Sequence, residues 1–257
     1  MILSCRSVLV IVSAALIVCA ADAQQTNPTG APNAPSATAA QQSAGQQGAT
    51  EAEVLKQEES QRILGVVPMF GVTSRQNAAP LTTDQKFHLF VKNALDPFVY
   101  VAVGIQAGIA QAQNNFEAYG QGAEGYAKRY GAALADGTAS NFFSNFLYPT
   151  LLKEDPRYFR FGEGPVKHRI GYALAQEFVC HTDKGGRSFN FSNVLGAVSA
   201  GGLSNAYYPP DDRGFGLTMS RAGISLMWGS LGGLISEFWP DIHRKVFEKH
   251  PKTGSKP

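Results

Sequence analysis

The amino-acid sequence predicts an all-α fold, organised as a compact multi-helix bundle that follows a disordered linker. Three observations lead to this prediction. Beyond Thr82, apolar residues recur every three or four positions over most of the chain, which is the period of a helix buried on one face. No segment alternates apolar and polar residues long enough to predict a strand. Glycine, alanine and serine are concentrated in the predicted helices, where they favour close contacts between helices.

The first residues predict a cleaved secretory signal. Arg6 precedes the short apolar run Val8–Val18, and residues 21–23 (Ala-Asp-Ala) have the small side chains typical of a cleavage site. The run is shorter than the ~20 residues that cross a bilayer as a helix. We therefore expect cleavage after Ala23 and export to the periplasm, the outer membrane or the medium. A lipidated Cys19 stays open as an alternative.

The rest of the chain divides by composition. Residues 24–50 are uncharged and of low complexity, which predicts a disordered linker. Residues 51–80 form an arm with a short polar helix, followed by an apolar stretch that Pro68 breaks. We expect one helical domain over residues 81–249 and a polar tail over 250–257.

Local signals place the helices of this domain. Thr82 and Gln85 have the spacing of a capping box, and Asp96 followed by Pro97 predicts the start of the next helix. A third helix is expected from about Ala123 to Ala135, with an interruption at Gly137. The later helices are expected over residues 140–147, 165–180, 192–207, 217–238 (ended by Pro240) and 241–249.

Long stretches of these helices carry no charge. The uncharged windows are 97–116, 137–152, 188–210 and 222–236. Within them, small residues four positions apart predict close helix packing at Gly104, Gly108, Gly229 and Gly233. Two interpretations compete: a tightly packed bundle, or helices that enter a bilayer. Interrupting asparagines and a mean hydropathy of -0.12 favour the packed bundle.

Composition and motifs argue against several classes of function. A net charge of +2 provides no field that would attract nucleic acid. The five histidines have no metal-ligand spacing, and no phosphate loop, dinucleotide fingerprint or nucleophile elbow occurs. We therefore assign no catalytic residue, metal site or cofactor. Cys180 is the single cysteine after the signal, and we expect it to be a buried free thiol.

One basic and aromatic region is a candidate ligand site. It lies between residues 153 and 169, with a second polar-aromatic corner near residue 207. A rim of this kind suits a phosphate head group or an acidic glycan, whereas the alternative is an ordered loop whose arginines pair with Glu154, Asp155 and Glu163. The candidate residues are Arg157, Tyr158, Arg160, His168, Arg169, Tyr207 and Tyr208.

Three segments carry a resemblance to a known family. They are EDPRYFRFGEG (154–164), RIGYAL (169–174) and NFSNVLG…SNAYYP (190–209). In these segments the chain resembles a family of exported bacterial helical proteins to which no activity is attached. The resemblance covers roughly residues 116–238 and implies a cell-envelope protein, but it transfers no catalytic residue.

The sequence therefore predicts an exported cell-envelope protein with a structural or interaction role. Its expected partners are a membrane surface, an envelope protein or a second copy of the chain. Two alternatives stay open: an envelope hydrolase or lipid- or phosphate-binding protein that uses the basic-aromatic loop, and a membrane-inserted helical protein.

Overall fold

The computed structural model describes residues 51–247. The expected signal peptide, linker and polar tail lie outside these residues. The described chain is mostly helical, which confirms the helical class, but it also contains several strands of two to four residues. The all-α prediction therefore holds for the helices but omits these short strands. These strands are too short to show an alternating pattern in the sequence.

The elements follow one another in a simple order from the arm to the last helix. They are α3 (Glu51–Glu58), β1 (Arg62–Ile63), β2 (Val67–Pro68), β3 (Val72–Thr73), α4 (Thr83–Ala94), α5 (Pro97–Ala112), η2 (Glu117–Tyr119), α6 (Gly122–Phe142), η3 (Phe143–Leu147), α7 (Tyr148–Leu152), β4 (Glu154–Asp155), β5 (Tyr158–Phe159), α8 (Val166–Ala175), β6 (Val179–Thr182), β7 (Arg187–Phe189), α9 (Phe191–Ser204), η4 (Pro210–Asp212) and α10 (Phe215–Phe247).

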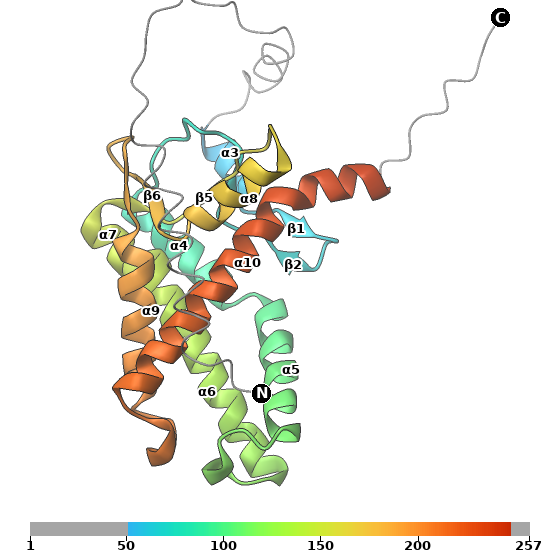
Figure 1. The fold of residues 1–257 in the computed structure, drawn as a ribbon. Coiled ribbons are helices and arrows are strands. Elements are labelled where there is room, and N and C mark those ends of the chain that lie inside the picture. Colours follow the sequence, from blue (N-terminus) through green and yellow to red (C-terminus); the bar gives the residue numbers. More distant parts are fainter. Residues whose placement is uncertain (1–50, 248–257) are drawn as a thin grey trace, which may run out of the picture.

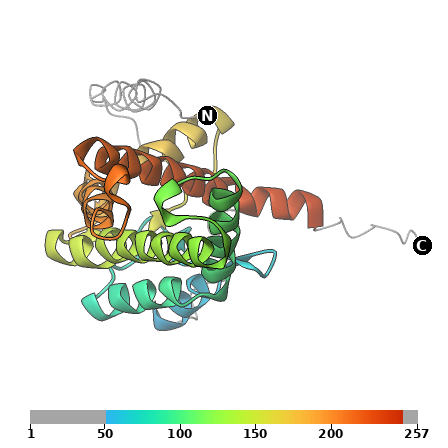
Figure 2. The ribbon, with the colours of Figure 1, turned by 90° about the horizontal axis from the view of Figure 1, so that it is seen from below.

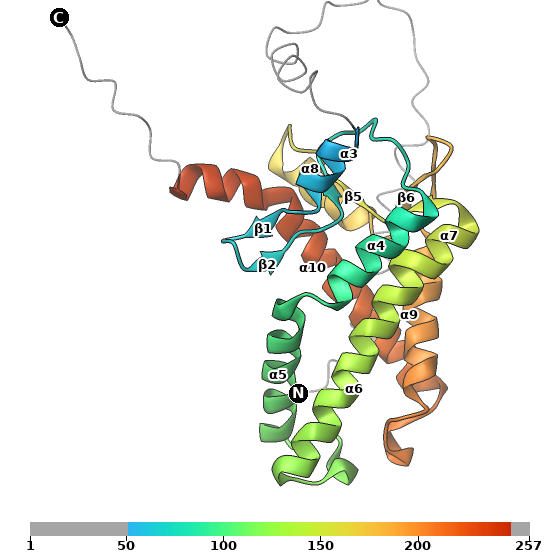
Figure 3. The same cartoon turned by 180° about the vertical axis from the view of Figure 1, so that it is seen from behind.

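The helices form two regions. In the lower half of Figure 1, α5, α6 and α9 run lengthwise, and the long α10 crosses obliquely from the foot of α9 to the opposite upper side. The strands, α3 and α8 gather at the upper end, which the view from behind in Figure 3 confirms. Seen from below, α4 and α10 lie on opposite sides of α6 (Figure 2). Helix α10 packs on α9 and α8, while α5 packs on α6.

The short strands join parts of the chain that are distant in sequence. β1 and β2 form an antiparallel hairpin, whereas β3 pairs in parallel with β5, with Val72 opposite Tyr158. β4, β6 and β7 form a three-stranded antiparallel sheet. The arm is thus tied into the upper region through β3.

Two expected helix starts are confirmed. The Thr82 hydroxyl accepts a hydrogen bond from the Gln85 main-chain N–H, and the Gln85 side chain accepts one from the Thr82 N–H, which completes the capping box. Asp96 caps α5 by accepting from the Phe98 N–H, with Pro97 at the first helical position.

The interruption expected at Gly137 is wrong, because α6 continues through it to Phe142. Glycine costs about 1 kcal/mol in a helix, and packing against the neighbouring helices outweighs so small a cost. The break comes later and takes another form: residues 143–147 (η3) are π-helical and lead directly into α7.

Two further expected boundaries are wrong. The helix that begins near Pro165 ends at Ala175, and Cys180 lies in strand β6. Helix α10 does not end at Pro240 but contains it. Arg160 Nε and Arg169 Nη2 both donate to the main-chain carbonyl of Glu237 at 3.0 and 2.8 Å, next to the turn that the proline disturbs. Tertiary contacts therefore support this turn.

The interior is built largely from small side chains. Seven of the sixteen buried apolar residues are alanines, at positions 107, 132, 139, 173, 197, 200 and 222. Many large apolar side chains face outward instead, including Val101 and Ile105 on α5 and Trp228 on α10, each more than 60% exposed. Small interior side chains do not fill the space between the lower helices, and a cavity remains there.

Candidate ligand-binding cavity

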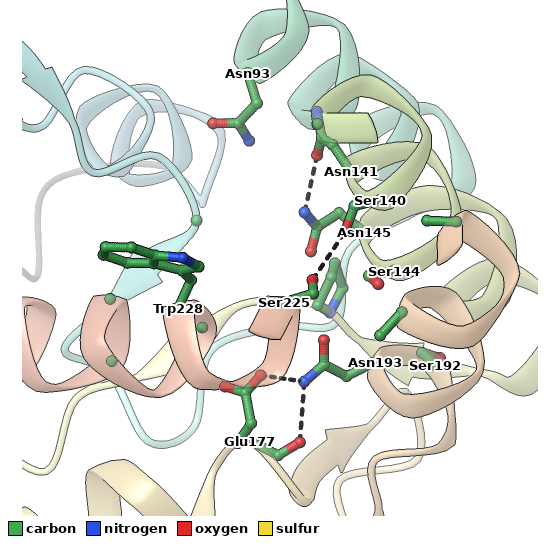
Figure 4. A pocket seen from close by; sticks show the side chains of 18 of the residues that line it. Asn93, Ser140, Asn141, Ser144, Asn145, Glu177, Ser192, Asn193, Ser225 and Trp228 are labelled. Atoms are coloured by element: carbon green, nitrogen blue, oxygen red, sulfur yellow. Dashed lines mark hydrogen bonds between the residues drawn. The ribbon is translucent and has the colours of Figure 1, made fainter. Parts of the chain in front are cut away.

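A cavity of about 870 Å³ lies between α5, α6, α9 and α10. Its upper end is closed by the segment from β4 to β5 and by the chain that follows α8. Figure 4 shows polar side chains pointing into this space from several elements. We refer to it as the central cavity.

Helix α6 and the π-helical segment η3 supply one polar wall. Asn145 Nδ2 donates to Asn141 Oδ1 at 2.8 Å, and Asn141 Nδ2 donates to the main-chain carbonyl of Phe90 at 3.1 Å (Figure 4). Ser140 and Ser144 also line the cavity. A π-helical turn shifts the register of the side chains that follow it, and such turns recur at functional sites.

The opposite wall holds a carboxyl group. Glu177 follows α8, and its Oε1 accepts a hydrogen bond from Asn193 Nδ2 at 2.7 Å (Figure 4). Burial raises the pKa of this carboxyl from its ordinary value to about 7. The carboxyl lies against Gly229 of α10, where a Cβ atom would collide with it. Gly229 therefore makes room for the Glu177 side chain.

Ser192, at the start of α9, presents a buried hydroxyl to the cavity wall. The residue is 2% exposed, and its Oγ has no hydrogen-bond partner. Its main-chain N–H donates to Glu154 Oε2 at 2.9 Å. An unpartnered buried hydroxyl costs roughly 1–3 kcal/mol. Among the described residues, four other buried side-chain oxygens also have no hydrogen-bond partner, but Ser192 is the one of the five that lines the cavity.

The charged groups at the lower end of the cavity are paired. Asp136 accepts hydrogen bonds from the hydroxyls of Tyr207 and Tyr208, both at 2.6 Å. The Arg221 guanidinium lies 4.0 Å from the centre of the Tyr208 ring and donates to the Asp212 carbonyl at 2.6 Å. These groups are engaged with one another and do not offer a free charge.

The upper end is also paired, and it contains the basic residues expected to bind a ligand. Arg157 is 5% exposed, and its Nη2 lies 2.7 Å from Asp155 Oδ2, with Glu58 at 3.6 Å from Nη1. Arg169 pairs with Glu237 at 2.7 Å and with Asp241 at 2.6 Å. We call these six residues the ion-pair cap.

Glu237 is the centre of the ion-pair cap. It is fully buried and also accepts from the Tyr158 hydroxyl and from the main-chain N–H groups of Phe161 and Gly162, at 2.9–3.0 Å. Burial opposes its ionisation, but the hydrogen bond from Arg169 and those from the main chain hold the pKa of the carboxyl below its ordinary value.

The structure therefore does not gather the seven candidate residues into one open site. Arg160 pairs with Asp241 at 3.4 Å and borders a separate pocket near Trp239. The His168 ring packs against Phe161. Tyr207 and Tyr208 lie at the other end of the central cavity from Tyr158, so the corner they form does not face the basic loop. Glu154 and Glu163, two of the three expected partners, do not pair with these arginines, whereas Asp155 does.

The glycines expected at helix contacts meet different groups. A Cβ atom on Gly104 or Gly108 would lie 3.3–4.0 Å from side-chain atoms of Tyr126 on α6. On Gly233 it would lie 3.3 Å from the main-chain carbonyl of Ala173 on α8. Among the described glycines, two others approach another helix backbone more closely: a Cβ on Gly196 would lie 2.8 Å from the Ser144 main-chain nitrogen, and one on Gly201 would lie 2.8 Å from the Thr218 carbonyl oxygen.

Cys180 is a buried free thiol, as expected. Burial raises its pKa to about 11, with the nearby Glu154 acting in the same direction, so the thiol is not a ready nucleophile. The thiol lies in strand β6 and not at the end of the helix expected over residues 165–180. Within residues 51–247 there is no cluster of three or more side chains suited to a metal ion.

Three of the candidate residues, Arg157, Tyr158 and Tyr208, line the central cavity, but sequence reasoning missed the amide, hydroxyl and carboxyl groups of its wall. Asn141 and Asn145 are one helical turn apart inside an uncharged window, which is a signal for a shared polar face. Glu177 and Asn193 come from separate elements, and no local pattern indicates that they meet. Comparisons of the chain with protein-family models, with curated proteins and with solved structures give no match.

Proposed function

We propose that this protein is an exported cell-envelope protein that acts by binding a small ligand in the central cavity. The observation that carries the proposal is a cavity of about 870 Å³ whose wall includes the unpartnered buried hydroxyl of Ser192. Its volume falls in the range of ligand pockets, roughly 300–1,000 Å³. Export is supported by the signal-like first 23 residues, and an envelope role by the family resemblance.

The rival site at the basic-aromatic loop has less support. Its arginines are committed to carboxylates of the ion-pair cap, and an anion would have to displace those carboxylates. The neutral groups of the cavity also hydrogen-bond within the protein, but exchanging such a bond for one to a ligand costs less than separating a buried arginine from its carboxylate.

A cavity-filling variant tests the proposal. Ser225 lines the cavity from α10, and Ser225→Phe places a phenyl ring in it; Ser220→Phe adds the same ring at an exposed site on that helix. Neutral saccharides, a zwitterionic detergent and inorganic phosphate would be screened by their effect on the melting temperature. We expect at least one probe to stabilise the wild type and Ser220→Phe but not Ser225→Phe. No stabilisation by any probe contradicts the proposal.

A second candidate function is attachment to a membrane surface. Val101, Ile105 and Ile109 are one turn apart on the outer face of α5, and each is more than half exposed. Exposed apolar patches of this kind mark interaction sites. Across the described range of the chain, no helix has both the length and the apolar character needed to span a bilayer.

Vesicle flotation tests this second candidate. Changing the three α5 residues to serine is expected to release the protein from phosphatidylcholine vesicles. The control variant carries serine at Leu64 and Val66, which are as exposed but lie at the β1–β2 turn. Equal flotation of wild type and the α5 variant would contradict attachment through this face.

A further inference from the structure

Between the charged groups at its two ends, the central cavity is lined by neutral hydrogen-bonding groups from several elements. Asn141 and Asn145 come from α6 and η3, Ser225 from α10, and Ser192 and Asn193 from α9. Amide and hydroxyl groups both donate and accept hydrogen bonds, and so does each hydroxyl of a ligand. A ligand that forms hydrogen bonds with several walls of the cavity carries polar groups around its whole periphery. A lipid, with polar groups at one end, does not match this arrangement.

The charges of the wall disfavour an anionic ligand. The two arginines that line the cavity, Arg157 and Arg221, are held by Asp155 and by the Tyr208 ring with the Asp212 carbonyl. No cation in the described part of the wall is therefore free for a phosphate or carboxylate. Glu177 is largely buried and keeps a pKa near 7, so it accepts or donates a hydrogen bond without demanding a cationic partner.

An aromatic ring stands at the edge of this polar space. Trp228 lines the cavity from α10 but remains 64% exposed, and Figure 4 shows it one turn along the helix from Ser225. Its neighbour Gly229 contacts the Glu177 carboxyl. A flat apolar ring beside amide, hydroxyl and carboxyl groups suits a molecule with one apolar face and polar edges, because aromatic side chains combine large contact area with specific geometry.

We infer that the central cavity binds a neutral saccharide. A sugar ring offers an apolar C–H face for the indole of Trp228 and hydroxyl groups for Asn141, Asn145 and Asn193, with one hydroxyl completing the missing hydrogen bond of Ser192. This inference rests on the proposed function and narrows its ligand to one chemical class.

Maltose and N,N′-diacetylchitobiose are suitable probes, titrated into the full mature chain. The chain has two tryptophans, so a Trp239→Phe background assigns the fluorescence change to Trp228. We expect saturable binding of at least one disaccharide, detected by fluorescence and by calorimetry.

Ser192→Ala separates binding from folding. The hydroxyl has no partner within the protein, so its removal is expected to leave the melting temperature unchanged or higher. Affinity for the disaccharide is expected to fall about tenfold, because one hydrogen bond to the ligand is lost. Asn145→Ala is expected to weaken binding similarly, whereas Ser220→Ala and Asn115→Ala, at exposed sites away from the cavity, leave it unchanged.

The outcomes distinguish this inference from the proposed function. If neither disaccharide binds, but the zwitterionic detergent or phosphate binds and Ser225→Phe abolishes that binding, the saccharide inference is overturned and the proposed function stands. If no probe binds, both are overturned. Disaccharide binding that Ser192→Ala and Asn145→Ala both leave intact occurs elsewhere on the protein and also overturns the inference.

Discussion

The ion-pair cap and the central cavity solve the problem of buried polar groups in opposite ways. In the cap, every buried charge has a partner within 4 Å, and Glu237 accepts hydrogen bonds from several donors at once. In the cavity, neutral amide and hydroxyl groups line the wall between the charged groups of its two ends, and the buried Ser192 hydroxyl has no hydrogen-bond partner. The charged groups of the cap are used in ion pairs within the protein, whereas some polar groups of the cavity wall retain unused hydrogen-bonding capacity.

The difference between the two regions follows from the cost of burying each kind of polar group. Desolvating a charge costs several kcal/mol, so a buried arginine survives only with carboxylates beside it. An unmet neutral hydroxyl costs roughly 1–3 kcal/mol, which a fold can tolerate. Buried oxygens without a hydrogen-bond partner occur in both regions, at Ser192 in the cavity and at Glu58 and Asp241 in the cap, so the two regions differ in charge and not in how completely their hydrogen bonds are made.

The largest effect is expected from removing the centre of the ion-pair cap. Glu237→Ala leaves Arg169 buried without one of its two carboxylate partners, and we expect a loss of about 3–5 kcal/mol in the free energy of unfolding, measured with urea. Arg244→Ala is the control, because Arg244 also pairs with Asp241 but is 68% exposed, and it should cost less than about 1 kcal/mol. Similar losses for the two variants would remove the distinction between the cap and the surface.

Two adjacent glycines of α9 test the packing of the cavity walls. In Gly201→Ala the new Cβ lies 2.8 Å from the Thr218 carbonyl, and we expect a loss of about 1–3 kcal/mol. A Cβ on Gly202 meets no atom within 4 Å, so Gly202→Ala is expected to stabilise by about 0.5–1 kcal/mol. Denaturant unfolding of the pair gives the sign directly, and equal effects would show that α9 and α10 are not in close contact.

The Glu177 carboxyl predicts a pH dependence located in the cavity. Burial raises its pKa from 4.5 to about 7, so the folded state holds a proton that the unfolded state has released between these values. The stabilisation is complete below about pH 4.5 and is lost as pH rises through 7, by about 3 kcal/mol. Glu177→Gln should remove this slope from the unfolding free energy.

The comparison for this prediction is the difference between wild type and Glu177→Gln, because other groups titrate in the same range. A difference that does not change between pH 4.5 and pH 8 would mean that the carboxyl is well solvated, and the cavity would then be wetter and more open than its geometry indicates.

The smallest effect is expected at a feature that belongs to neither region. Thr82→Ala removes the hydroxyl that caps α4, and a loss of about 1 kcal/mol in unfolding free energy is expected from the missing cap. Disaccharide affinity should not change. A change in affinity would show that the start of α4 is coupled to the cavity, which its position does not suggest.

The sequence predicted the elements that short-range chemistry controls. The caps at Thr82 and Asp96 depend on residues within three positions, and both form as expected. The expected interruptions at Gly137 and Pro240 failed because a single residue costs about 1–3 kcal/mol in a helix, and packing or arginine contacts can exceed that. The sequence did not indicate the short strands for a different reason. A strand of two residues pairs only where the fold brings its partner strand close.

The candidate site was less predictable than the fold. The arginines near residue 160 suggested a binding site because the sequence shows their charge. It does not show which carboxylates pair with them. Arg169 pairs with Glu237, which is 68 positions later in the chain, and no local pattern predicts that pairing. The signal that did exist was the pair Asn141 and Asn145, one turn apart in an uncharged helix.

By itself, the sequence determined the helical class and two of the helix starts, because periodicity and capping act over a few residues. The tertiary structure alone decided which charges neutralise each other and which polar groups stay unpaired. Packing small interior side chains left a cavity between α5, α6, α9 and α10, and it placed Glu177, Asn193 and Ser192 at its wall. Those positions depend on contacts between distant segments, where burial, and not local preference, sets the free energy.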